Sequence, residues 1–416
     1  MKKQQIKAAL VATAAGLAFA PQIHAQSADA LIDKLVDKGI LTAKEAGDLR
    51  AEADKDFTKA LSSKNGMPEW VTALKFNGDF RGRYEGFFSD NPAFEERNRF
   101  RYRLRAGFTA VMLDDIEAGF RLGSGDLDRA SGIVSGVDPI SNNQSFQNNG
   151  SKKGIFLDLA YGKWSPIHSG GWNGALTFGK MENPFVLSDM VFDGDYTPEG
   201  AAQQFGYQFN ADHALRLNLG AFVLDELSAS TQDPWLFGSQ LRFESTWSPK
   251  LSSSLGVSFL SIQNVEQLPS SGVPDINVGN TRVATRAANG TYALGAATSD
   301  FTPVVLDAAL TYTLENAPFY TGLFPVKVFG DYINNFGADA DNQGWSAGIT
   351  FGKAGKRKTW ELTYRYKHLE GDAWWEELTD SDSGGFYQDA GPVSPAPEPA
   401  MRATRTAGPT SAAISR

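Results

Sequence analysis

The chain has 416 residues, a formal net charge of −9 and no cysteine. Its acidic balance argues against general affinity for nucleic acid, and the lack of thiols excludes both a disulfide framework and a thiolate metal site. No stretch reaches the roughly 18 consecutive apolar residues of a membrane-spanning helix, so the sequence predicts no transmembrane helices.

Residues 1–25 have the organisation of a secretory signal peptide. A basic start with Lys2, Lys3 and Lys7 leads into a short apolar run, and Ala25 offers a small residue for cleavage. We therefore expect the protein to be exported and the signal to be removed.

Residues 26–66 are predicted to form a helical segment followed by a linker. Apolar residues recur at helical spacing from Leu31 to Val36, and Thr42 with Glu45 forms a capping box that opens a second helix. Two interpretations stay open for this periplasmic segment. It is either a hairpin that plugs or flanks the mouth of a barrel, or a contact for oligomerisation or the cell wall.

The stretch Arg97–Met112 shows the pattern that characterises the body of the chain. Alternate residues from Phe100 to Met112 are apolar, whereas the intervening positions from Arg99 to Arg105 are all arginine. Such alternation has the period of a β-strand, because successive side chains leave a strand on opposite faces. A strand between lipid and a water-filled lumen needs apolar residues on one face and polar residues on the other.

Twelve further segments alternate in a similar way, at residues 74–88, 116–124, 154–164, 174–180, 201–210, 214–224, 235–247, 253–262, 303–314, 326–334, 345–352 and 359–368. The links after even-numbered segments are mostly short, whereas long links follow odd-numbered ones, notably residues 125–153, 181–200 and 263–302. Short turns opposite long loops are typical of outer-membrane barrels. The sequence therefore predicts an all-β fold, a transmembrane antiparallel β-barrel, over residues 67–385.

Several motifs, in their order, resemble the putative porin family of Gram-negative outer membranes. They are LIDKLVDKGILTAKEAGDLRAE, LKFNGDFRGRYEGF, ERNRFRYRLRAGF, LTFGKMENPF, PEGAAQQFGYQF and VKVFGDYINN. The resemblance extends over about Ala28–Gly385. It implies a single-chain barrel, of 16 strands in the family, that sits in outer-membrane lipid and passes small solutes or ions by diffusion.

The end of the chain departs from this family pattern. Only about 13 strands are predicted here, and they are followed by a tail rich in proline and alanine at residues 386–416. Such a composition predicts disorder. Because an open barrel leaves backbone groups unpaired in hydrocarbon, we expect this barrel to close poorly or with an irregular seam.

Seven arginines occupy inward positions of three adjacent predicted strands, and we call them the arginine ladder. They are Arg81, Arg83, Arg99, Arg101, Arg103, Arg105 and Arg121. An arginine on the lipid face would cost about 2–4 kcal/mol at the bilayer midplane, so the ladder must face the lumen. There it either lines the conducting path or is structural, with paired charges filling the wall.

The loop after the fifth predicted strand, residues 181–200, is the candidate constriction and is called the acidic loop below. It carries Glu182, Asp189, Asp193, Asp195 and Glu199. General porins, which the chain resembles more loosely, fold this loop into the lumen and often form trimers. The resemblance therefore implies that acid faces base across a constriction, which would orient polar solutes, and that the chain assembles as a homotrimer.

Nothing in the sequence indicates an enzyme. Outside the signal, the only histidines are His168, His213 and His368. They lie in predicted turns or at a strand end, and no serine or acidic residue accompanies them at a spacing that suggests a catalytic triad. No HExxH, Walker or dinucleotide-binding motif appears, so no cofactor or metal is predicted.

Two further classes of protein compete with a porin. The long loops at residues 125–153 and 263–302 would serve an adhesin or structural barrel, although their Ser, Asn and Gly content is that of plain surface loops. A soluble exported β-protein is disfavoured by the aromatic outer faces. We therefore predict an outer-membrane porin, with the adhesin as the alternative.

Overall fold

The computed structural model describes residues 68, 70–87, 97–126, 140–268, 279–286, 292–380, 405–407 and 412–414. The chain divides into two compact units, residues 1–74 and 75–416. The predicted signal peptide and periplasmic helical segment, residues 1–66, lie outside the described residues. Among those described, no helix is long and apolar enough to cross a membrane.

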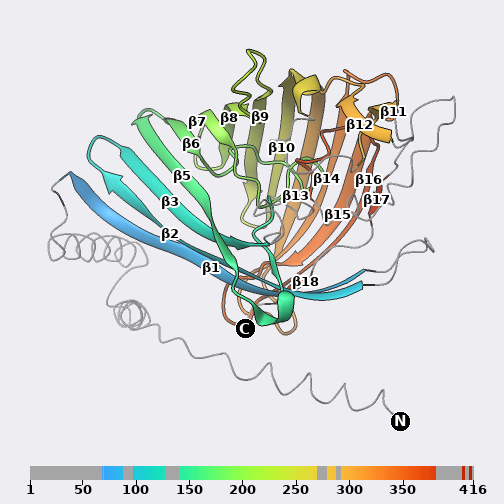
Figure 1. Ribbon diagram of the computed structural model, residues 1–416. Coiled ribbons are helices and arrows are strands. Elements are labelled where there is room, and N and C mark those ends of the chain that lie inside the picture. Colours follow the sequence, from blue (N-terminus) through green and yellow to red (C-terminus); the bar gives the residue numbers. More distant parts are fainter. Residues whose placement is uncertain are drawn as a thin grey trace, which may run out of the picture. The chain divides into compact units, whose positions relative to one another are not determined.

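Thirteen long strands form the body of the sheet (Figure 1), which confirms the predicted fold class. They are β1 (Val71–Phe87), β2 (Arg97–Met112), β3 (Ile116–Gly125), β5 (Gly154–Ile167), β6 (Trp172–Lys180), β7 (Glu199–Gln208), β8 (His213–Val223), β9 (Trp235–Ser248), β10 (Leu251–Gln263), β13 (Pro303–Leu314), β14 (Phe324–Asn335), β15 (Gln343–Gly352) and β16 (Trp360–Leu369). Consecutive long strands are neighbours in the sheet, and the pairings from β2 to β16 are antiparallel.

Shorter elements lie in the loops and near the end of the chain. They are β4 (Gln144–Ser145), the 3₁₀ turns η1 (Asn148–Gly150) and η2 (Val265–Gln267), the hairpin strands β11 (Arg282–Arg286) and β12 (Tyr292–Ala297), and β17 (Arg405–Ala407) and β18 (Ala412–Ile414). The β2–β3 turn shows why some connections are tight. Asp114 and Asp115 have φ values of 59° and 60°, a left-handed conformation that Asp tolerates better than most residues.

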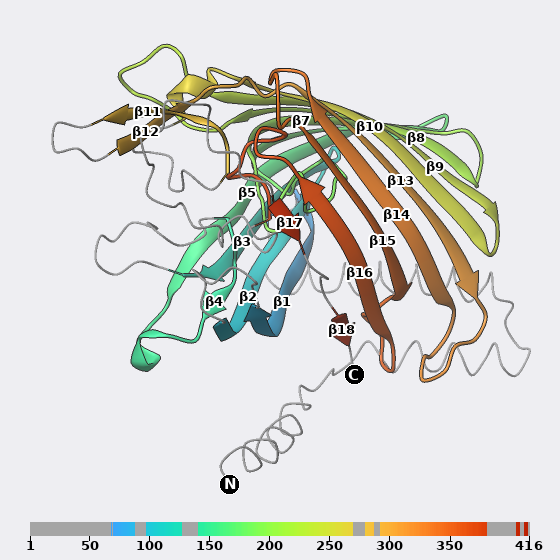
Figure 2. The ribbon, with the colours of Figure 1, turned by 90° about the vertical axis from the view of Figure 1, so that its right-hand side faces the viewer.

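The sheet runs from β1 to β16 and curves strongly (Figure 2). In the described part of the chain, no pairing joins β1 to β16. The barrel is therefore not closed, in agreement with the expectation that it closes poorly. Both short strands of the predicted tail pair with β16, as Lys367↔Ala407 and Leu362↔Ala412. The two pairs are five residues apart on β16 and five residues apart in the tail, so β17 and β18 pair with β16 in the same register. The remainder of the tail lies outside the described residues, and its disorder stays a prediction.

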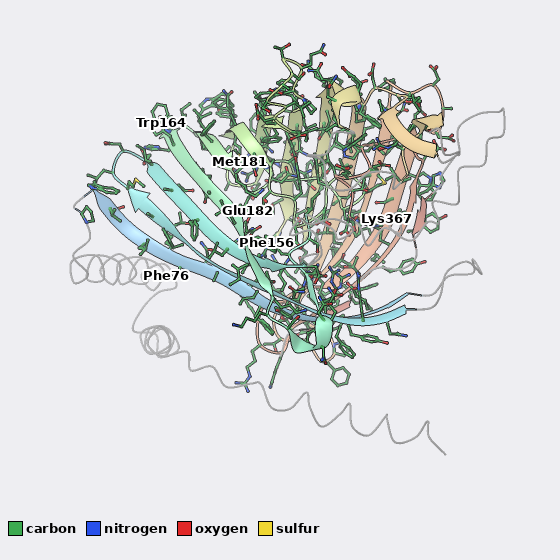
Figure 3. The ribbon with its side chains drawn as sticks, in the orientation of Figure 1. Phe76, Phe156, Trp164, Met181, Glu182 and Lys367 are labelled. Atoms are coloured by element: carbon green, nitrogen blue, oxygen red, sulfur yellow. The ribbon has the colours of Figure 1, made fainter. Side chains whose placement is uncertain are left out.

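The outer face of the sheet is apolar and exposed. Phe76 and Phe178 are 76% and 72% exposed, and large apolar side chains follow at alternate positions along the other long strands; Figure 3 labels Phe76 and Trp164 among them. Single exposed apolar residues are ordinary, but a continuous apolar surface of this extent marks a membrane or protein contact. The opposite face carries charged side chains, as period-two alternation requires.

Candidate pore constriction

The acidic loop lies on the inner, concave face of the sheet. It leaves β6 at Lys180 and contacts side chains of β2, β9 and β16, through Arg103, Gln240 and Lys367 respectively. These three strands are far apart in the sheet, and one loop can reach all of them only across the concave face. Figure 3 labels Met181 and Glu182, where the loop begins.

Hydrogen bonds to both backbone polar groups of Val186 fix the middle of this loop. The Val186 N–H donates to Gln240 Oε1 at 2.9 Å, while Gln240 Nε2 and Arg242 Nη1 donate to the Val186 carbonyl at 3.0 and 3.1 Å. Gln240 is fully buried. A buried amide that satisfies both a donor and an acceptor of the loop backbone favours a single loop position, because any shift would leave polar groups unpaired.

Apolar packing holds the same loop from the other side. The loop's buried side chains include Met181, Phe185, Met190, Val191 and Phe192, which pack in one cluster with inward residues of β8, β9, β10, β13 and β14. Full burial of such a side chain contributes roughly 1.5–3 kcal/mol. The acidic loop therefore has a dry apolar side in addition to its charged residues.

One carboxylate organises three ladder arginines. Glu85 lies 2.6 Å from Arg83 Nε and 3.6 Å from Arg101 Nη1, and it also forms an ion pair with Arg99. The side chains of Arg101 and Glu85 are only 4% and 5% exposed. These three arginines therefore share one carboxylate partner within the wall.

A polar segment around β4 completes this part of the wall. Asn143 Oδ1 accepts from Arg81 Nη2 at 2.6 Å, and the Asn143 carbonyl accepts from Arg101 Nη2 at 3.2 Å. Asn142 donates to Asp158 Oδ1 at 3.0 Å. The segment thus lies beside the ladder and supplies neutral acceptors for its guanidinium groups.

The acidic loop meets the ladder directly at Asp195. Asp195 Oδ1 lies 2.7 Å from Arg103 Nη1 and 3.7 Å from Arg105 Nη1. On the other side, Asp79 lies 2.9 Å from Arg103 Nη2 and 2.5 Å from Arg105 Nε. The two arginines are therefore held between a carboxylate of β1 and a carboxylate of the loop.

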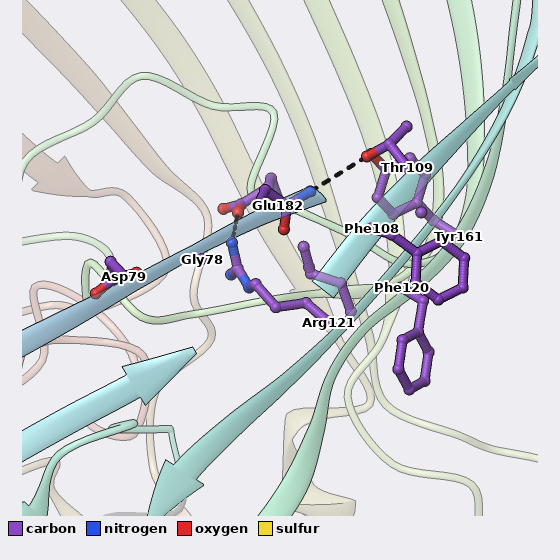
Figure 4. Close-up of a pocket in the computed structure, with 11 residues that line it drawn as sticks. Gly78, Asp79, Phe108, Thr109, Phe120, Arg121, Tyr161 and Glu182 are labelled. Carbon is purple, nitrogen blue, oxygen red and sulfur yellow. Dashed lines mark hydrogen bonds and ion pairs between the residues drawn. The ribbon is translucent and has the colours of Figure 1, made fainter. Parts of the chain in front are cut away.

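A second contact joins Glu182 to Arg121, which also pairs with Asp158 of β5. Here the Arg121 side chain is 11% exposed and Glu182 is 62% exposed. Beside this pair lies a cavity of about 280 Å³, whose lining includes Thr109, Arg121, Tyr161 and Glu182 (Figure 4). Part of the wall between ladder and loop is therefore open.

The sequence profile of the putative porin family matches residues 91–323, more than half of the chain. The chain belongs to this family. A comparison with curated proteins finds no match. Membership points to a channel rather than an enzyme.

Solved structures of three outer-membrane proteins are similar to this porin-family chain. OprB of Pseudomonas putida at high pH has 12% identity and a TM-score of 0.41, with 75% of this chain and 80% of that chain covered. The in-vitro-folded trimer form of OmpT from Vibrio cholerae has 10% identity and a TM-score of 0.39, covering 74% and 93%. OmpF of Salmonella typhi in complex with daunomycin has 8% identity and a TM-score of 0.37, covering 74% and 94%.

The remaining predicted acids of the acidic loop make other contacts. Asp189 pairs with Arg365 and lies 3.1 Å from Lys367 Nζ, both on β16. Glu199 lies 3.1 Å from Lys180 at the loop's two ends. Asp193 accepts from the Asp195 N–H at 2.6 Å and so shapes the loop itself.

The sequence interpretation missed the basic side chains opposite Asp189. Arg365 and Lys367 alternate with Leu362, Tyr364 and Tyr366, the pattern that identified the ladder on β2. The signal was present in β16, but one arginine and one lysine beside Glu361 and Thr363 stand out less than the four inward arginines of β2. No group of three or more metal-ligating side chains is present in the part of the chain that the structure describes.

Proposed function

We propose that the chain is an outer-membrane porin through which small polar or charged solutes diffuse. The observation that carries this proposal is the pairing of an exposed apolar outer face with a charged inner face that a loop crosses. A bilayer satisfies the outer face, and only water or polar solutes satisfy the inner one. The protein is exported to the outer membrane, and its partners are membrane lipid and the passing solutes.

The solute path runs along the arginine ladder and is narrowed by the acidic loop. Asp195 against Arg103, and Glu182 against Arg121, are the contacts that support this placement. Opposed charges across a constriction create a transverse field, and the charges nearest the path set ion selectivity. The same pairs also stabilise the wall, so the structural and conducting roles of the ladder are compatible.

Single-channel recording in planar bilayers tests the proposal. We expect discrete steps of constant size from purified protein that shows heat-modifiable migration, a sign of a folded barrel. Folded protein that inserts but passes no current would refute the porin and favour the adhesin or structural barrel that acts through its long loops.

A homotrimer, implied by the resemblance to general porins, stays a proposal for the assembled state. Light scattering of the detergent-solubilised protein tests it, with a mass of three protomers expected. A monomeric mass in several mild detergents would contradict it.

A further inference from the structure

The residues that follow β16 form a buried segment on the inner face. We call residues 370–380 the inner segment; Ala373 is fully buried, and Trp374 and Trp375 are each only 1% exposed. Two tryptophans after the last long strand would ordinarily belong to an exposed loop or an interfacial belt. Their complete burial indicates that the chain turns inward here rather than continuing into solvent.

The inner segment packs against the back of the acidic loop. The Asp193 N–H donates to the Leu378 carbonyl at 2.8 Å, and the Asp380 N–H donates to the Asp189 carbonyl at 3.1 Å. The rings of Phe192 and Trp374 meet edge to face with centroids 6.0 Å apart. The two segments therefore share one apolar cluster and one short run of backbone hydrogen bonds.

A buried ion pair locks the inner segment to the loop between β10 and β13. Glu376 pairs with Arg282 of β11, with side chains 0% and 1% exposed, and the guanidinium lies 4.8 Å from the centre of the Trp375 ring. The Asn280 N–H donates to Glu376 Oε2 at 2.6 Å. Asn280 Nδ2 donates to the carbonyls of Gly371 and Trp374 at 2.7 and 2.8 Å.

Open space lies on the other side of the acidic loop. One cavity is the 280 Å³ space beside Arg121 and Glu182, and a second of about 360 Å³ is lined by residues that include Asp158, Lys180 and Asp195. Both border β3 or β5 and the loop's charged residues, whereas the apolar cluster borders β8 to β16. The loop thus separates a side with open cavities and charged lining from a packed apolar side.

We propose that the inner segment, locked by Arg282 and Glu376, seals the β13–β16 side of the lumen and confines solutes to the ladder side. This inference rests on the proposed porin function. Arg282 and Glu376 touch no solute in this arrangement. They are positioning residues that hold the acidic loop from behind, so that Asp195 and Glu182 stay against the ladder.

The buried pair determines how its variants should behave. Removing one partner leaves an uncompensated charge in a dry site, whereas an apolar pair of similar volume is often tolerated. Glu376→Gln and Arg282→Met should therefore each loosen the inner segment. The double variant Arg282→Met with Glu376→Gln should restore it, because it removes both charges and keeps an amide oxygen at position 376 to accept from the Asn280 N–H. Arg216→Gln is the matched control, because the pair of Arg216 with Glu244 is 50% and 39% exposed.

Single-channel recording and hydrogen exchange measure the effect. In each single variant we expect roughly doubled, noisier conductance, because a wider cross-section carries current, together with faster amide exchange at residues 370–380. The double variant and Arg216→Gln should match wild type. Folded single variants with wild-type conductance and exchange would overturn the proposal.

Cysteine accessibility tests the seal with milder substitutions, should the single variants fail to fold. The chain has no cysteine, so Thr109→Cys, which lines the 280 Å³ cavity, and Ala373→Cys can be compared directly. A charged methanethiosulfonate should label position 109 and lower the current, and leave position 373 unlabelled. Equal labelling of the two would overturn the seal. If wild type passes no current, the porin function fails, yet labelling still decides whether the segment is buried.

Discussion

Replacement of Asp195 by Asn tests whether the contact between loop and ladder lies on the conducting path. The substitution removes one negative charge and keeps nearly the same volume. Arg103 retains Asp79 at 2.9 Å, so it is not left unpaired. Since Asp195 is only 7% exposed in this ion pair, we expect a loss of about 1–3 kcal/mol in the free energy of unfolding, which a barrel of this size tolerates.

The effect on selectivity follows from Coulomb's law. A monovalent ion that passes about 6 Å from this carboxylate interacts with it by roughly 0.7 kcal/mol in bulk water. Loss of the charge disfavours cations and favours anions by this amount each, a combined change of about 1.4 kcal/mol, or about tenfold in the permeability ratio. The shift should be largest near 0.1 M salt and shrink at 1 M, where screening acts over about 3 Å.

Reversal potentials in a salt gradient measure this ratio. The matched control is Glu315→Gln, which removes the same charge from the turn between β13 and β14, where Glu315 pairs with Lys250 at 2.7 Å. Arg103→Gln should shift selectivity in the opposite direction, towards cations. Stable steps from Asp195→Asn with an unchanged reversal potential, or an equal shift in Glu315→Gln, would refute the reasoning.

Three further predictions concern the rest of the barrel. Cysteines at Leu362 and Ala412, which are directly opposed, should form an intramolecular disulfide that speeds migration in non-reducing gels; dimers or no bond would contradict the β16–β18 register. Val257 lies at the middle of β10 and is 43% exposed. Val257→Arg should cost about 2–4 kcal/mol of folding free energy in bilayers, whereas Val257→Leu should be neutral. Equal urea unfolding midpoints for the two variants would show that this face does not contact lipid. The hydrogen bond and charge of Lys250 lower the pKa of Glu315, so this pair's stabilisation holds above the ordinary pKa of Glu and disappears as pH falls through the lowered value. In Lys250→Met, carboxyl NMR titration should show the Glu315 pKa back in its usual range. A Glu315 pKa that is unchanged by this substitution would show that Lys250 does not lower it.

The strands could be predicted from the sequence because two solvents act on them. Lipid and water on opposite faces impose a strict alternation, which is visible in single strands such as β2 without knowledge of their partners. The same rule placed the arginines on the inner face. It did not show which carboxylate pairs with which arginine. Glu85 of β1 meets Arg99 of β2 through the register of the two strands, which the sequence pattern alone does not fix across a loop.

The inner segment could not be predicted for a different reason. Its sequence, from Glu370 to Asp380, has neither a strand period nor a helix period, and its burial depends on apolar surface that the acidic loop offers. Arg282 and Glu376 lie 94 residues apart in the chain. Contacts of this kind follow from the tertiary arrangement of two loops, which no local pattern encodes.

The acidic loop connects the two ends of the open sheet. Asp195 binds Arg103 on β2, near the first strand, and Asp189 binds Arg365 and Lys367 on β16, the last long strand. In the described residues no strand pairing joins these ends, so the loop supplies a connection across the lumen that backbone hydrogen bonds supply in a closed barrel. The charges that would act on a passing solute are thus also those that hold the curved sheet together. Among the ladder residues, Arg103 and Arg105 take part in this connection through Asp195, whereas Arg83, Arg99 and Arg101 pair with Glu85 within β1 and β2.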